Sequence, residues 1–160
     1  MRVPLLPSAL LLGLLVTACG KDAAPPAAAA SGAPPASALT PWEQAHGVGP
    51  ITTPVTLGPV DRHMAEEGKE YFETHCASCH KANERYVGPA LGGVVDRRGP
   101  EYVMNMVLDP TDMVRKHPEA KKLFATFMVE MPNLNLTQEQ ARQVMEYLRT
   151  LPAPPATPAQ

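Results

Sequence analysis

Two cysteines and a histidine stand within five consecutive positions, in the stretch His75-Cys-Ala-Ser-Cys-His80. Thiols at this spacing can form a disulfide, serve a redox enzyme, bind zinc or attach a haem. On a helical turn, Cys76 and Cys79 point toward the same side, because residues three positions apart are neighbours on a helix surface. The next residue, His80, can then bring an imidazole beneath a flat ligand that both thiols hold.

The surrounding sequence favours one of these chemistries. A thioredoxin-like redox pair is typical of a βαβ pattern, and none surrounds this motif. A zinc site needs two further ligands, and His63 and His75 do not have the paired spacing of a zinc finger. A disulfide could form in an exported chain. Cys-x-x-Cys-His is the attachment signature of c-type haem, so we expect one covalent haem c on Cys76 and Cys79, with His80 beneath the iron.

The N-terminus predicts export. Residues 1–18 carry Arg2 ahead of an apolar run that is shorter than the roughly 20 residues needed to span a bilayer, as in a signal peptide. The run ends at Val16-Thr-Ala-Cys19, which resembles a bacterial lipoprotein box and implies that Cys19 becomes the lipidated first residue of the mature protein. An ordinary signal peptide with an incidental cysteine is the alternative. We expect a periplasmic protein tethered to the membrane by this lipid.

Composition divides the rest of the chain. Residues 19–60 comprise a lipid-anchored linker rich in alanine and proline and, in their second half, a segment whose proline density we expect to exclude helix. This segment, residues 39–59, is either an extended arm lying on the domain or more linker. Residues 61–151 form one small domain, which a cofactor would help to stabilise, and residues 152–160 a disordered tail. The net charge of −2, with both signs interspersed, predicts no nucleic-acid partner.

The domain is predicted to be all-α, with about four helices around the haem. Apolar residues recur at helical spacing over 61–75, 100–108, 118–127 and 137–151. Asp61 is a plausible N-cap, while Thr137 and Gln140 form a capping box. The dipeptide Asp109-Pro110 is expected to close the second helix. No segment alternates as a β-strand does.

Residues 61–151 resemble a class I cytochrome c, with one haem. The match includes Gly68-Lys-Glu-Tyr-Phe72 before the haem motif and Gly88-Pro-Ala-Leu91 after it. The resemblance implies that Gly68 lets the first and last helices cross closely, with Tyr147 beside the crossing. It also implies that the carbonyl of Pro89 accepts a hydrogen bond from His80.

A methionine is the expected second axial ligand. Met131 precedes Pro132, which disfavours helix, and it lies six positions before the capped last helix. This matches the Met-Pro loop of class I cytochromes and implies that the Met131 sulfur binds iron opposite His80. Met128 is the main alternative, and Met113, expected in a loop, is weaker. Asn133 and Asn135 could donate hydrogen bonds to the sulfur or form a turn. Arg97 and Arg98 could pair with haem propionates or lie in a solvated turn. The remaining histidines are expected at the surface or in packing.

Histidine–methionine ligation would leave no vacant iron position and would raise the reduction potential. The expected function is therefore a monomeric electron carrier, linking a quinol-oxidising complex or another cytochrome to a terminal reductase or oxidase. Residues 46–50, 83–94 and 131–142 look like those of cytochromes that accompany nitrous-oxide reductase. The alternatives are a peroxidase-like haem enzyme with an open iron and a gas or redox sensor in which Met131 is displaced.

Overall fold

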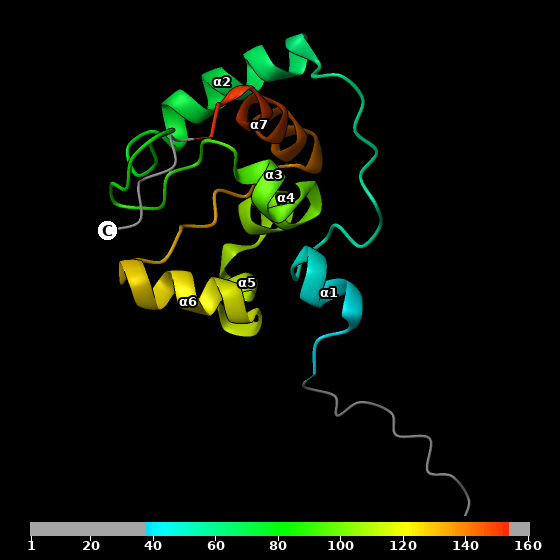
Figure 1. Ribbon diagram of the computed structural model, residues 1–160, viewed down its shortest axis with the longest axis vertical. Coiled ribbons are helices and arrows are strands. Elements are labelled where there is room, and N and C mark those ends of the chain that lie inside the picture. The colour runs from blue at the N-terminus through cyan, green and yellow to red at the C-terminus, as the bar shows by residue number, and fades with distance from the viewer. Residues whose placement is uncertain (1–37, 154–160) are drawn as a thin grey trace, which may run out of the picture. The chain divides into compact units, whose positions relative to one another are not determined.

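A computed structural model describes residues 38–153, and within this range the chain forms seven helices and no strand (Figure 1). The all-α prediction is therefore confirmed. The predicted signal peptide, Cys19, the tether up to residue 37 and residues 154–160 lie outside the described residues. Among the described helices, none combines the length and apolar character needed to cross a bilayer. The helices are α1 Pro41–His46, α2 Arg62–His75, α3 Val94–Arg98, α4 Pro100–Leu108, α5 Pro110–Lys116, α6 Pro118–Phe127 and α7 Gln138–Thr150.

The four predicted helices correspond to α2, α4, α6 and α7, but the exclusion of helix from residues 39–59 is wrong. Pro41 is the first residue of α1, where proline lacks only an N–H that would have no partner within the helix. Thr40 and Glu43 close a capping box around it. Pro110 likewise both follows α4 and opens α5, so Met113 lies in a helix and not in the expected loop.

Helices α2 and α7 form the most extensive helix–helix contact of the domain. A Cβ atom at Gly68 would lie 2.0 Å from the carbonyl oxygen of Gln143, so only glycine permits this approach. The ring of Tyr147 lies beside that of Phe72, with 5.2 Å between centroids. The close crossing implied by the family resemblance is thus present. The main core lies between α2, α4 and α7 and includes Val103, Met104, Val144, Met145 and Leu148.

Residues 39–59 lie on the domain as an arm, which decides between the two readings of this segment. Val48 is buried with Tyr102, Met113 and Ala120, which come from α4, α5 and α6. Ile51 belongs to the main core. The arm therefore joins both apolar clusters, and the domain begins well before Asp61.

Candidate functional site

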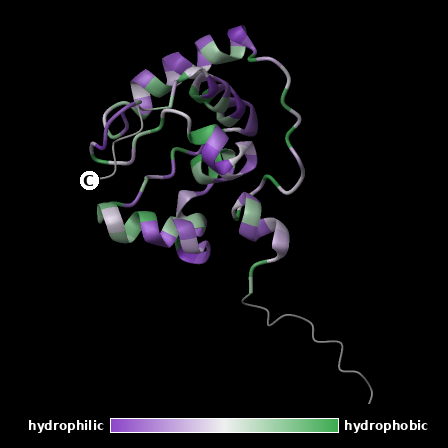
Figure 2. Ribbon diagram, in the orientation of Figure 1, coloured by the Kyte–Doolittle hydropathy of each residue, from purple (hydrophilic) through white to green (hydrophobic). Residues whose placement is uncertain are grey.

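A mostly apolar cavity of about 410 Å³ lies inside the domain. One wall is formed by the end of α2 and the loop that follows it, and the opposite wall by α4, α5, α6 and the loop that leads to α7. Figure 2 shows that α6 changes from a hydrophilic first half to a hydrophobic end. That end contributes Phe124 and Phe127 to the cavity, and the exposed Val87 and Val129 stand at its rim.

The Cys-x-x-Cys-His motif lies on the first wall. Helix α2 ends at Cys76, and the N–H groups of Cys79 and His80 both donate to the carbonyl oxygen of Cys76, at 3.0 and 2.9 Å. This tight turn directs all three residues to the cavity, which they line. Both cysteines are free thiols. Burial, and to a lesser extent the neighbouring Cys79, raises the pKa of the Cys76 thiol to about 11, so it stays protonated at neutral pH.

His80 is held in one orientation. Its Nδ1 atom lies 3.1 Å from the carbonyl oxygen of Pro89, the hydrogen bond that the family resemblance implied. Because a carbonyl oxygen can only accept, Nδ1 carries the proton and the lone pair is on Nε2. Burial lowers the pKa of the ring, against the weaker opposing effect of the Pro89 bond, which favours the neutral form that binds metals. A Cβ atom at Gly88 would lie 2.5 Å from His80 Cε1, so the ring packs directly on the Gly88 backbone.

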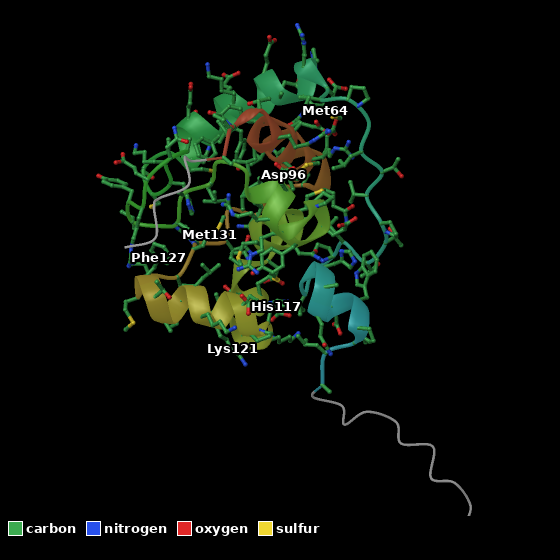
Figure 3. The ribbon with its side chains drawn as sticks, in the orientation of Figure 1. Met64, Asp96, His117, Lys121, Phe127 and Met131 are labelled. Carbon is green, nitrogen blue, oxygen red and sulfur yellow. The ribbon has the colours of Figure 1, made fainter. Side chains whose placement is uncertain are left out.

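Met131 lines the cavity from the loop between α6 and α7, where Figure 3 labels it together with Phe127. The two alternative methionines do not line the cavity. Met128 is the C-cap residue that follows α6 and is 74% exposed, and Met113 is completely buried with its sulfur accepting the Val48 N–H. Met106 of α4 also lines the cavity.

The comparisons with known proteins agree with this arrangement. The family model described as cytochrome c matches residues 65–152. The chain belongs to the cytochrome c family. The protein is 25% identical over 122 residues to cytochrome c2 of Rhodopseudomonas palustris, which covers 61% of this chain and 87% of that protein.

Solved cytochromes extend the comparison. A cytochrome c from Rhodothermus marinus is 41% identical to this protein, with a TM-score of 0.64. The match covers 69% of this chain and 95% of the Rhodothermus chain. An engineered form of that protein, bound to a carbene intermediate, is also 41% identical over 69% of this chain and 96% of its own, with a TM-score of 0.61. This cytochrome is therefore similar to electron-carrier proteins of the same small helical fold.

Cytochromes c carry covalent haem c, and the residues of this cytochrome fit that group. Cys76 and Cys79 supply the two thiols, the neutral ring of His80 supplies a nitrogen lone pair, and the apolar cavity accommodates a macrocycle. Tyr102 also lines the cavity, and its buried hydroxyl has no partner among the described residues, so it is available to a haem carboxylate. The site thus brings together two thiols, an imidazole, an apolar cavity and a buried hydroxyl donor without a partner among the described residues.

The remaining sequence candidates have defined positions. Arg97 and Arg98 lie in α3 at the cavity wall and not in a solvated turn; Arg97 donates to the carbonyl of Gly92, and Arg98 pairs with Glu119 at 3.3 Å. Asn133 accepts the N–H of Asn135, which has a φ of 54°, so these two form a turn.

Sequence reasoning missed three groups at the cavity or its rim: Tyr102, Phe127 as a lining residue, and Arg85 beside it. Tyr102 and Phe127 both fall on predicted helices, where an aromatic residue indicates core packing as readily as contact with a cofactor. Arg85 lies in a loop, and nothing in its local sequence indicates a partner 41 residues away.

Proposed function

We propose that this cytochrome is a single-electron carrier whose haem iron is ligated by His80 and Met131. The observation that carries the proposal is the position of these two residues on facing walls of one cavity, with both attachment cysteines beside His80. Two strong protein ligands leave no iron position for a substrate, so an electron can cross the exposed edge without bond formation. Thioether ligation also raises the reduction potential relative to two nitrogen ligands.

The carrier is proposed to be monomeric and to work in the periplasm, tethered to the membrane. This part rests on the N-terminal sequence: an apolar leader, the lipobox-like Val16-Thr-Ala-Cys19, and an alanine- and proline-rich stretch before the arm. A lipidated cysteine carries several acyl chains, which suffices for stable anchoring.

Its partners are proposed to be a quinol-oxidising complex or another cytochrome as donor, and a terminal reductase or oxidase as acceptor. The stretches 46–50, 83–94 and 131–142 resemble cytochromes that accompany nitrous-oxide reductase, which is therefore the first acceptor to test. The test is whether the reduced protein is oxidised by that enzyme only when nitrous oxide is supplied.

The visible spectrum tests the ligation. The purified protein should give sharp reduced bands, a weak red sulfur-to-ferric-iron band and no response to carbon monoxide. Met131→Ala should keep the haem attached but give a high-spin iron that binds carbon monoxide. Met106→Leu is the matched control, because Met106 also lines the cavity, and its spectrum should equal that of the wild type.

Other outcomes identify the alternatives. Carbon monoxide binding by the unaltered protein would indicate an open or labile iron and would favour a haem enzyme or a gas sensor. Loss of the red band in Met106→Leu, with Met131→Ala unchanged, would assign the sulfur ligand to α4 and contradict the proposed ligation.

A further inference from the structure

Helix α6 forms part of the mouth of the haem cavity and leads directly into the loop that carries Met131. Its most extensive helix contact is with α5, and its second half is exposed at Phe124, Ala125 and Thr126. The helix ends at Phe127 and is followed by its C-cap residue Met128, a residue other than glycine with a φ of 55°; Met131 follows three positions after Met128. The position of Met131 therefore depends on what holds the C-terminal end of α6.

Arg85 reaches that end from the opposite wall. It belongs to the loop after His80, yet its guanidinium donates to the carbonyl oxygen of Thr126 at 2.8 Å. The same group lies over the ring of Phe127, 4.3 Å from the centroid. The last carbonyls of a helix lack intrahelical partners and carry partial negative charge, so a cation is favoured there. Arg85 thus bridges the His80 side and the Met131 side of the cavity.

We propose that Arg85 is a positioning residue that keeps Met131 on the iron by fastening the end of α6 to the loop after His80. The inference rests on the proposed His80–Met131 ligation. For an outside ligand to reach the iron, Met131 must leave it, and movement of its loop away from the haem would pull Phe127 from the guanidinium. Both Arg85 contacts hold the end of α6 in the described arrangement, so they oppose any movement that carries this end away from the haem, without touching the iron.

Lys81 supplies a matched comparison. It carries the same charge on the same loop, but its ammonium donates to the carbonyl oxygen of Ala77 at 2.9 Å and lies 5.2 Å from the Tyr86 ring centroid. Both partners belong to the His80 side, so Lys81 does not bridge the cavity. Substitution of Lys81 changes the surface charge without changing what holds α6.

The experiment measures how fast the ferric, haem-loaded protein binds imidazole at saturating concentration, where the rate is limited by opening. Arg85→Gln should open faster than the wild type by at least about 10-fold, because a hydrogen bond from a charged donor and an exposed cation–π contact are both lost. Arg85→Lys should fall between the two, since it keeps the charge but loses the planar fork. Lys81→Gln should open at the wild-type rate.

The outcomes separate this inference from the proposed function. If Met131→Ala leaves the spectrum unchanged, the ligation proposal fails and this inference fails with it. If Met131→Ala opens the iron while Arg85→Gln binds imidazole at the wild-type rate, only the role of Arg85 is overturned. Equal acceleration in Lys81→Gln would assign the effect to surface charge and would also overturn it. Two control measurements exclude folding defects in Lys81→Gln and Arg85→Lys. Their covalent haem content and their unfolding midpoint should equal those of the wild type.

Discussion

At the scale of single residues, the orientation of His80 depends on a neighbour that has no side chain. The imidazole packs on the backbone of Gly88, and the next residue, Pro89, accepts the Nδ1 proton. The Gly-Pro dipeptide therefore supplies both the space for the ring and the hydrogen bond that fixes its rotation. A bond of this kind also increases the basicity of the ligating nitrogen.

Gly88→Ala should displace the imidazole, because the new methyl group would stand 2.5 Å from His80 Cε1. We expect covalent haem to remain, a mixture of spin states in the visible spectrum, and a free energy of unfolding lower by about 1–3 kcal/mol, as for other overpacked sites. Gly58→Ala is the control, since a Cβ atom there meets nothing within 4 Å. A low-spin spectrum with wild-type stability in Gly88→Ala would show that the ring has room to move.

At the scale of elements, local signals identified helices better than they identified contacts. The capping box at Thr137 and the apolar stripe predicted α7 correctly, because both act within a few residues. Three further helices, α1, α3 and α5, were not predicted, and α1 and α5 were missed because proline was interpreted as a helix breaker. Four of the seven described helices, α1, α4, α5 and α6, begin with proline. The motif residues of the site could likewise be read from spacing, whereas Tyr102 and Phe127 could not be recognised as lining residues.

Buried polar residues of α4 show why the attachment of the arm could not be read from the sequence. Asn105 is fully buried and accepts the N–H of Ile51 at 2.9 Å, while its own amide donates to the carbonyls of His46 and Ile51 at 3.1 Å. Glu101 accepts the N–H of Val55 at 2.7 Å. The spacing of apolar residues predicts only which face of α4 a residue occupies. It does not predict these hydrogen-bond partners, because they lie 46–59 positions away in the sequence.

Asn105→Leu should release the arm, because it leaves one N–H and two carbonyl groups buried without partners. We expect the free energy of unfolding to fall by about 2–4 kcal/mol, given a cost of about 1–3 kcal/mol for each unsatisfied group and some relief from water entry. Protease sensitivity near residues 46–55 should rise. Asn83→Leu makes the same exchange at an exposed position and should change stability by less than about 0.5 kcal/mol. Equal stability of the two variants would contradict the role assigned to Asn105.

At the scale of the whole molecule, the cavity shows that the protein chain alone does not complete its core. Side chains from α2, α4, α5 and α6 face a space of about 410 Å³. Protein interiors are otherwise close-packed, and the lining of an empty space loses its dispersion contacts. The covalent haem is thus expected to be part of the core as well as the redox centre.

Removal of both attachment thiols tests this expectation. Cys76→Ala combined with Cys79→Ala should abolish covalent haem and leave a chain without a sharp thermal transition, with weaker near-ultraviolet circular dichroism. The proposed lipid anchor is tested separately: if Cys19 carries it, Cys19→Ser keeps haem and folding but moves the protein from the membrane fraction to the periplasmic one. A haem-free double variant that unfolds cooperatively would show that the chain can close the cavity without the cofactor.

The arm also determines where this protein can be cut for laboratory production. A boundary drawn from the helix pattern would fall at Asp61 and would discard Val48 and Ile51. The shortened chain would expose Tyr102 and Met113 and leave Glu101 and Asn105 without the backbone groups that they bind. An expression plasmid intended for crystallography or voltammetry should therefore encode a chain that starts before Leu39, so that the product keeps the arm.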